Sequence, residues 1–133
     1  MALKLRLMRD DEVLLEIPLE QEDEAPRGLV DAFPDLQDEV NEVLGIHKVL
    51  ANQTRSRLLF NVVKGFDRRF SELMVELDAN QKVLTESLQA MLGEGLLSKV
   101  EKNPREVHYR PSQKGIAALM ACFAMGRILR EVE

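Results

Sequence analysis

The chain has 133 residues, a mass of 15.1 kDa and a net charge of −5, with 45% apolar and 31% charged residues. This size is enough to fold without a metal ion or a disulfide, and the composition excludes a wholly disordered chain, a collagen and a coiled-coil rod. The single cysteine, Cys122, excludes an intrachain disulfide and a CxxC site. No apolar run approaches the ~20 residues of a membrane span, and the N-terminus lacks a signal-peptide core, so we expect a cytoplasmic protein with no membrane partner.

The charge is distributed unevenly along the chain. Residues 1–45 hold 4 basic and 13 acidic residues, whereas residues 46–115 hold 12 basic and 8 acidic residues. The acidic total argues weakly against a nucleic-acid partner, but the middle segment has a net charge of +4 of its own. Because asymmetry between regions is more informative than the total, nucleic acid stays open as a partner of the middle segment.

Residues 2–8 and 13–19 alternate apolar with polar side chains, a period of two that predicts two β-strands joined by a polar turn. Pro18 restricts the second strand to a sheet edge. The acidic stretch 20–28 is the best linker candidate, so we expect residues 1–28 to form a β-hairpin arm with an acidic loop. An isolated two-stranded hairpin is marginal in water, so its apolar side must dock on another surface.

The middle of the chain changes to the period of an α-helix. Apolar spacing, caps and turn residues predict helices over 35–51, 54–64, 70–77 and 81–92, then a hairpin with strands over 96–102 and 105–110, and a last helix over 113–132. Gly65 is expected to cap the second helix. This order is typical of a winged helix-turn-helix, so we expect an α+β, mainly α, fold. The DNA-binding domain would occupy residues 29–115, and a dimerisation helix residues 116–133.

The helix over 81–92 has two different sides. At 100° per residue, its core side carries Leu84, Leu88, Met91 and Leu92. The opposite side and the open end form the predicted DNA-reading set: Asn80, Gln81, Lys82, Thr85, Glu86 and Gln89. In a major groove Gln pairs with adenine, Lys donates to guanine and Glu accepts from cytosine. The alternative is a solvated face on which Lys82 and Glu86 form an ordinary i, i+4 pair.

Basic side chains gather on the second hairpin and just before the helix over 70–77. Lys102 and Arg105 flank the Asn103-Pro104 turn, where we expect contact with phosphates. The same role is assigned to the other members of the predicted phosphate-contacting set: Arg68, Arg69, Lys99, His108 and Arg110. The alternatives are an ordinary charged hairpin and, for the two arginines before the helix, a solvated loop.

The sequence shows no spacing typical of a catalytic or metal site. The two histidines are isolated, and with one cysteine they give neither a metal-ligand pattern nor a nucleophile–base pair. We therefore expect a protein that is not an enzyme and needs no cofactor.

The last helix is apolar on two sides. One side carries Ile116, Leu119, Met120 and Phe123, and the opposite side carries Ala118, Cys122, Met125, Leu129 and Val132. A domain of this size can cover only one side, so we expect the second set to form a homodimer interface. Cys122 is expected to be buried as a structural residue, because the chain has no second cysteine for a redox pair.

Residues 69–101 resemble the winged-helix regulators of the HxlR type. The resemblance rests on an Arg-Phe-Ser-x-Leu helix, a Gln-Lys-x-Leu-Thr helix and a following Gly-Leu, which are here Arg69, Phe70, Ser71, Leu73, Gln81, Lys82, Leu84, Thr85, Leu88, Gly95 and Leu96. Residues 107–111 and 114–115 resemble that family's wing exit, while residues 50–55 resemble the ArsR type. The resemblance covers about residues 48–120 and implies a DNA-binding transcription regulator.

Two functions are compatible with these patterns. In the first, the chain is a homodimeric regulator that binds double-stranded DNA. In the second, the same hairpin and helix form a protein-interaction module. The acidic N-terminal region and the lack of net charge on the helix over 81–92 favour this second function. The basic middle segment, the wing tip and the resemblance favour the first function. The patterns point to no particular small-molecule effector.

Overall fold

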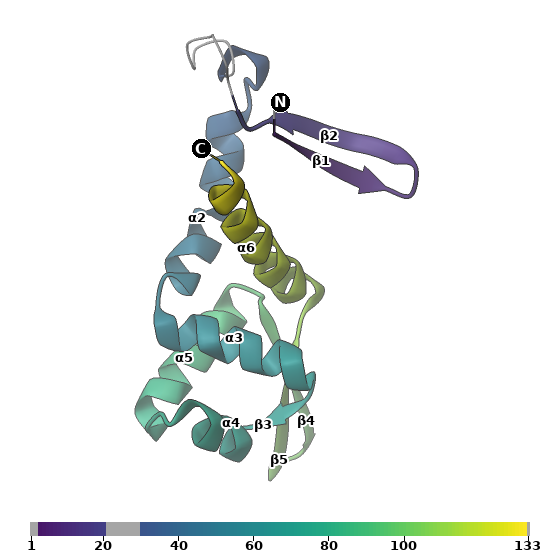
Figure 1. The fold of residues 1–133 in the computed structure, drawn as a ribbon. Helices are drawn as coiled ribbons and strands as arrows, with labels where there is room; N and C mark the ends of the chain where they lie inside the picture. The colour runs from purple at the N-terminus through teal and green to yellow at the C-terminus, as the bar shows by residue number, and fades with distance from the viewer. Residues whose placement is uncertain (1–2, 21–29, 133) are drawn as a thin grey trace. The chain divides into compact units, whose positions relative to one another are not determined.

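The computed structural model of the chain describes residues 3–20 and 30–132 (Figure 1). The chain divides into two compact units, Met1–Val40 with Ala124–Glu133, and Asn41–Phe123. We call the first the arm unit and the second the winged unit. The acidic loop predicted over 20–28 falls, except for its first residue, outside the described residues. Among the described helices, none is long and apolar enough to cross a membrane.

The arm unit begins with a β-hairpin, as the alternation predicts. Strands β1 (Lys4–Arg9) and β2 (Glu12–Pro18) pair antiparallel around a turn in which Asp10 has a φ of 52°. The register shifts once, between Leu7 and Met8, where β2 contributes an extra residue. Such a bulge increases the local twist of a hairpin.

The two faces of this hairpin differ in chemistry. Cross-strand partners point to the same side of a sheet, and the register pairs four aliphatic side chains on one face: Leu5, Leu7, Leu15 and Ile17. The other face is charged, because Glu16 forms ion pairs with Lys4 Nζ at 2.9 Å and with Arg6 Nη2 at 3.3 Å. The hairpin is therefore amphipathic.

The longer helices agree with the predicted ranges to within one residue at each end. They are α2 (Leu36–Leu50), α3 (Gln53–Gly65), α4 (Phe70–Leu77), α5 (Gln81–Gly93) and α6 (Gln113–Glu131). Two of them begin with an asparagine cap. The Oδ1 atom of Asn52 accepts from the backbone NH of Arg55 at 3.1 Å, and that of Asn80 accepts from Val83 at 2.8 Å. Each cap satisfies a backbone donor that the first helical turn leaves open.

The end of α3 differs from the prediction. Gly65 is still helical, and Phe66 takes the positive φ of 66° while its NH donates to the carbonyl of Val62 at 2.7 Å. Gly65 serves another purpose, since a Cβ there would collide with the guanidinium of Arg68. The glycine allows a close approach and does not supply the left-handed conformation.

The winged unit contains a three-stranded sheet in the order β3-β5-β4. Strands β4 (Leu97–Asn103) and β5 (Glu106–Pro111) are the predicted second hairpin. Strand β3 (Arg68–Arg69) was not predicted from the sequence, and it pairs antiparallel with Tyr109 and His108 of β5. Two residues are too short to show an alternating pattern, so periodicity could not reveal this strand. The order of helices and strands confirms the mainly helical α+β winged-helix fold.

The hydrophobic core lies in the winged unit, where α3 contacts α4, α5 and β5. Its buried apolar side chains are Leu58, Leu59, Val62, Leu73, Leu77, Leu84, Leu88, Met91, Leu96, Leu97 and Tyr109. On α5, three of the four predicted core residues are buried, and Leu92 is half-buried. The amphipathic pattern of α5 therefore fixes which of its sides meets solvent.

Helix α6 meets this core through its first half, and only in part with the side predicted. Ala118 and Leu119 pack against the core, whereas Met120 and Phe123 are exposed. Ala118 thus lies on the core-facing side of the helix. Cys122 is exposed in the single chain, contrary to the expectation of burial. Because α6 is apolar around most of its circumference, periodicity alone does not select the side that faces the core.

The first turn of α6 lies against the backbone of Leu96. Ser112 Oγ accepts from the NH of Gly115 at 2.9 Å and donates to the carbonyl of Gly95 at 2.6 Å. The NH of Ser112 donates to the carbonyl of Leu96 at 3.2 Å. Gly115 is buried, and a Cβ at this position would collide with the carbonyl oxygen of Leu96.

Gly115→Ala should therefore lower the free energy of unfolding by about 1–3 kcal/mol, the usual cost of overpacking. Gly126→Ala is the matched control, because Gly126 lies in the same helix with open space where its Cβ would be. Alanine there should raise helix stability by about 0.5–1 kcal/mol. Urea denaturation followed by circular dichroism measures both changes, and equal effects at the two positions would contradict the close approach.

Candidate nucleic-acid interface

Helix α5 presents a polar face on the side opposite its buried stripe. Its exposed side chains are Gln81, Lys82, Thr85, Glu86 and Gln89, and the exposed cap Asn80 precedes them. Within the described part of the chain, no ion pair joins Lys82 to Glu86. The amide, ammonium, hydroxyl and carboxylate groups of this face are therefore available to an external partner.

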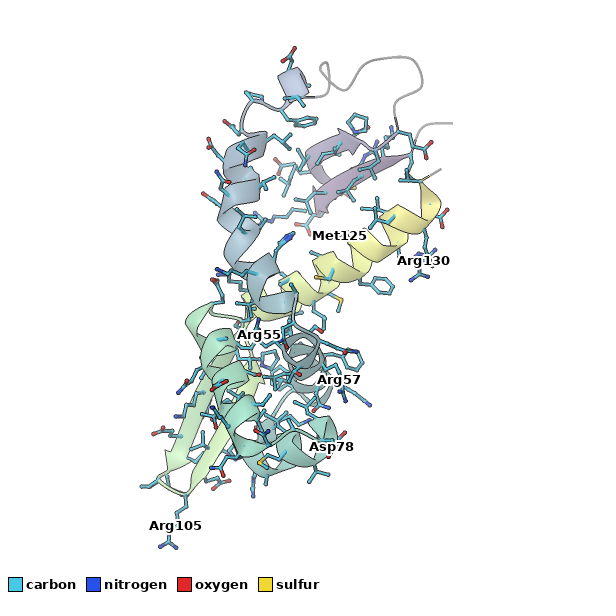
Figure 2. All side chains as sticks on the ribbon, turned by 90° about the vertical axis from the view of Figure 1, so that its left-hand side faces the viewer. Arg55, Arg57, Asp78, Arg105, Met125 and Arg130 are labelled. Atoms are coloured by element: carbon cyan, nitrogen blue, oxygen red, sulfur yellow. The ribbon has the colours of Figure 1, made fainter. Side chains whose placement is uncertain are left out.

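A tight turn sets α5 across α4. Helix α4 ends at Leu77, and Asp78, labelled in Figure 2, follows in the left-handed conformation with φ 48° and ψ 42°. Aspartate tolerates this conformation better than most residues. Leu77 and Leu84 are both buried, one on each side of the turn, and so anchor the two helices to one core.

The tip of the β4–β5 hairpin, the wing, carries free positive charge. Asn103 Oδ1 accepts from the backbone NH of Arg105 at 2.9 Å and so orders the turn. The side chain of Arg105 extends away from the end of the hairpin (Figure 2). Lys102 is exposed nearby, and among the described residues neither side chain forms an ion pair. A guanidinium in this position can bind a phosphate through two parallel hydrogen bonds.

A network of charged side chains joins β5 to the segment around β3 at the base of the wing. His108 Nδ1 lies 2.5 Å from Asp67 Oδ1, and His108 Nε2 lies 3.0 Å from Glu106 Oε1. Arg110 donates to Asp67 at 3.2 Å, and Arg69 donates to Glu106 at 3.2 Å. We call these five residues the base network. An ionised carboxylate only accepts hydrogen bonds, so both ring contacts form together when His108 carries a proton on each nitrogen.

The base network lowers the pKa of both carboxyl groups. For Asp67 the largest cause is the hydrogen bond from His108, with Arg110 acting in the same direction. For Glu106 the hydrogen bond from His108 is again the largest cause, and the charges of Arg69 and Lys102 add to it. Desolvation raises both pKa values but does not outweigh these contacts.

The base network corrects the role expected for His108. Its side chain is buried and both ring nitrogens face carboxylates, so it has no free group for a phosphate. Arg69 and Arg110 are partly exposed, but each is paired with a carboxylate of the network. These three side chains join β5 to the segment around β3, and Arg69 is the most exposed of them, with 58% of its side chain toward solvent against 36% for Arg110.

Two further members of the predicted phosphate-contacting set also have partners within the chain. Arg68 Nε donates to the carbonyl of Asn61 at 3.4 Å, and its Nη1 lies 3.8 Å from Glu72. Lys99 Nζ lies 3.3 Å from Glu101 on the same strand of the wing. Of the whole set, only Lys102 and Arg105 at the tip form no ion pair with the residues that the structure describes.

Asp67 and Glu106 are the site residues that the sequence reasoning missed. Glu106, His108 and Arg110 alternate along β5, so their side chains share one face, and this pattern was visible in the sequence. Asp67 gave no such signal, because its place depends on the pairing of β3 with β5. In the described ranges, no group of three or more His, Cys, Asp or Glu side chains could hold a metal ion.

Comparisons with known proteins identify the fold. No protein-family model matches the chain, and no curated protein matches its sequence. The transcriptional repressor BigR from Xylella fastidiosa has a similar structure, with a TM-score of 0.60 and 22% identity over 69% of this chain and 93% of that one. Reduced HlyU from Vibrio cholerae aligns with a TM-score of 0.60 and 19% identity, over 70% of this chain and 97% of that chain.

An ArsR-like transcriptional regulator from Rhodococcus gives a TM-score of 0.53 and 22% identity, over 68% of this chain and 84% of that one. These likenesses confirm the winged-helix fold. Of the two sequence resemblances, the ArsR type is the one that appears among these neighbours, and the HxlR type stays a prediction.

The lowered pKa values of Asp67 and Glu106 predict how stability responds to acid. Each carboxylate stabilises the fold above its ordinary pKa, which is 3.8 for Asp67 and 4.5 for Glu106, and this contribution is lost as pH falls through the lowered value in the folded state. Asp67→Asn with Glu106→Gln should therefore lower the Tm at pH 7 and flatten its decline below about pH 4.5.

Thermal unfolding across a pH series measures this effect. Glu101→Gln is the control, because Glu101 lies on the same hairpin and pairs only with Lys99. It should leave the acid-induced decline of the Tm as in the wild type. An unchanged decline in the double variant would show that the base network does not stabilise the wing.

Proposed function

We propose that the chain is a non-catalytic transcription regulator that binds double-stranded DNA sequence-specifically as a homodimer. The observation that carries this proposal is the unpaired polar face of α5, directed outward because its opposite stripe is buried in a winged-helix core. A recognition helix needs this arrangement to place side chains against base edges in the major groove.

The exposed polar side of α5, which we call the reading face, carries side chains that are chemically complementary to the edges of different bases. Gln89 offers an amide that can pair with adenine, Lys82 a donor for guanine and Glu86 an acceptor for the amino group of cytosine. Gln81 and Thr85 flank them, and Asn80 lies at the end of the helix where backbone phosphates pass. Mixed charge on this face favours selectivity over general attraction to DNA.

The wing supplies contacts to the DNA backbone. Lys102 and Arg105 at its tip bind phosphates, while Lys99 and the arginines before α4 contribute less because intrachain carboxylates already pair with them. Arg110 and His108 keep the wing in place through the base network. The structurally similar protein BigR is a transcriptional repressor, and this likeness supports the proposed function for a chain of the same fold.

Dimerisation is proposed through α6. Met125 is 46% exposed and Leu129 is 68% exposed, and Cys122 and Val132 are exposed on the same predicted side. Ala118 lies nearer the core and would form the inner edge of this interface. A two-fold dimer presents two copies of α5, so the operator should have dyad symmetry with half-sites one helical turn or a multiple apart.

One observation favours a second candidate, a protein-interaction module without DNA binding. Asp67 and Glu106 neutralise basic side chains of the wing, which weakens its attraction to phosphates. Selection of bound duplexes from a random pool at low salt separates the two functions. Enrichment of a dyad-symmetric motif supports the regulator, and failure to enrich any motif supports the interaction module.

The wing and the reading face should respond differently to substitution. Arg105→Ala removes one phosphate contact per subunit, so it should weaken binding to all duplexes alike and flatten the slope of log K against log salt by up to ~2 per dimer. Gln89→Ala should leave the slope unchanged and relax preference at one base pair per half-site, by roughly 1–3 kcal/mol. Binding isotherms over a salt series on selected and scrambled duplexes measure both effects.

Arg130→Ala is the control for lost positive charge, since Arg130 lies at the end of α6 outside the proposed interface. It should change neither the slope nor the preference. If Arg105→Ala altered preference while Gln89→Ala altered only the slope, α5 would not be the helix in the groove.

The α6 interface predicts a second outcome. Met125→Glu with Leu129→Glu would place uncompensated charges in a desolvated contact, so the dimer should dissociate. Sedimentation equilibrium measures the assembly, and Arg127→Glu on the same helix is the control because Arg127 already pairs in solvent with Glu131. A wild-type chain that is monomeric at micromolar concentration would contradict the homodimer.

A further inference from the structure

The arm unit has no buried side chain among its described residues, whereas every buried residue belongs to the winged unit. More than half of the exposed large apolar side chains of the described residues lie in the arm unit: Leu5, Leu7, Met8, Val13, Leu14, Leu15, Val30, Leu36, Val40, Met125, Leu129 and Val132. A monomeric protein rarely leaves so much apolar surface exposed. The described residues of the arm unit therefore form no closed core among themselves.

The hairpin shows this deficit most clearly. On its aliphatic face Leu5 is 38%, Leu7 55% and Leu15 40% exposed. A two-stranded hairpin is marginal in water unless its apolar face packs against something. On the opposite face Glu16 pairs with both Lys4 and Arg6, and Met8 and Val13 lie beside them toward the turn.

The walls of an open cavity extend this apolar surface. A volume of about 490 Å³ opens between β2 and residues 32–39, with Leu15 and Ile17 on one wall and Phe33, Pro34 and Leu36 among the residues of the other. This volume is many times the roughly 30 Å³ that a water molecule occupies. Folded cores are close-packed, so apolar walls this far apart call for further side chains between them.

We propose that the aliphatic face of the β1–β2 hairpin packs against a second copy of this chain, whose apolar side chains fill the cavity beside β2. The proposal rests on the homodimer proposed above and assigns it a second contact besides α6. In this dimer the hairpin belongs to the intersubunit core.

Two observations select a second copy as the occupant. By the register, the face is aliphatic except for Arg9 opposite Glu12 next to the turn, one charge of each sign, so it has no net charge that would select an unlike partner. In addition, Met125, Leu129 and Val132 of the proposed α6 interface belong to the same compact unit as the hairpin. A two-fold contact pairs the same patch with itself, so a dimer through these residues brings two arm units together.

Matched substitutions on the two faces of β1 test the proposal. Leu5→Thr with Leu7→Thr makes the aliphatic face polar, and Lys4→Thr with Arg6→Thr changes the charged face by the same residue type. Threonine favours strands, so both variants keep the tendency to form the hairpin. Sedimentation equilibrium on the full chain should show a dimer dissociation constant raised by about tenfold or more for the leucine variant. The lysine–arginine variant should stay close to the wild type.

A proximity measurement guards against a hairpin that merely unfolds. In chains carrying Cys122→Ser, pyrene maleimide is attached either at Leu7→Cys or at Arg6→Cys. Label on the aliphatic face should give excimer fluorescence that disappears when excess unlabelled chain is mixed in. Label on the charged face should give none.

The outcomes separate this proposal from the function on which it rests. The hairpin contact is overturned if the leucine variant has the same dimer dissociation constant as the wild type and label at position 7 gives no excimer. That result does not contradict the dimer through α6. A leucine variant that loses thermal stability while its assembly is unchanged shows that the hairpin packs on its own chain, which also overturns it. A wild-type monomer overturns both proposals, and isotherms on the selected duplex report DNA binding independently.

Discussion

The burial of one side of α5 is the constraint on which the rest of the winged unit depends. Leu84, Leu88 and Met91 pack into a core to which α3, α4 and β4 also contribute, so the helix cannot rotate without exposing them. Exposing even one such side chain costs about 1.5–3 kcal/mol, which is a large share of the stability of a small domain. The polar face, with Lys82 and Gln89, is therefore fixed in direction by residues that never contact a partner. Function at this surface follows from packing on the opposite side of the same helix.

The carboxylates near the wing hold its side chains in place but also reduce its positive charge. Asp67 and Glu106 fix His108, Arg69 and Arg110, and in doing so they cancel positive charge near the surface that would face DNA. The positive charge at the tip is not cancelled in this way. The side chain of Asn103 orders the turn by accepting from the backbone NH of Arg105, which leaves the guanidinium of Arg105 free. A wing arranged in this way attracts phosphates mainly at its end. In the proposed function, long-range attraction to DNA would then be modest, and discrimination would depend more on the reading face of α5.

The sequence predicted well those features that depend on local periodicity. The bounds of α4 agreed fully, and the reading face of α5 is exposed as expected, because both depend on an apolar stripe within one short segment. The predictions from the sequence were wrong or missing for features that depend on contacts between segments far apart in the chain. The strand β3 exists only because β5 lies beside it, and the pairing of Asp67 with His108 follows from that contact. The side of α6 that meets the core also depends on tertiary packing, since the helix is apolar nearly all round.

The two units differ in how they obtain stability. The winged unit closes around its own buried leucines. The arm unit has polar and apolar faces but no closed core among its described residues, and in the proposed dimer it would gain stability by association. Folding of the arm and assembly of the chain are then one equilibrium that depends on protein concentration. In the proposed function a palindromic site is bound by two copies of α5, so this equilibrium would also set the concentration at which the protein occupies DNA. The arm, which touches no base in this scheme, would thereby control occupancy as strongly as the reading helix does.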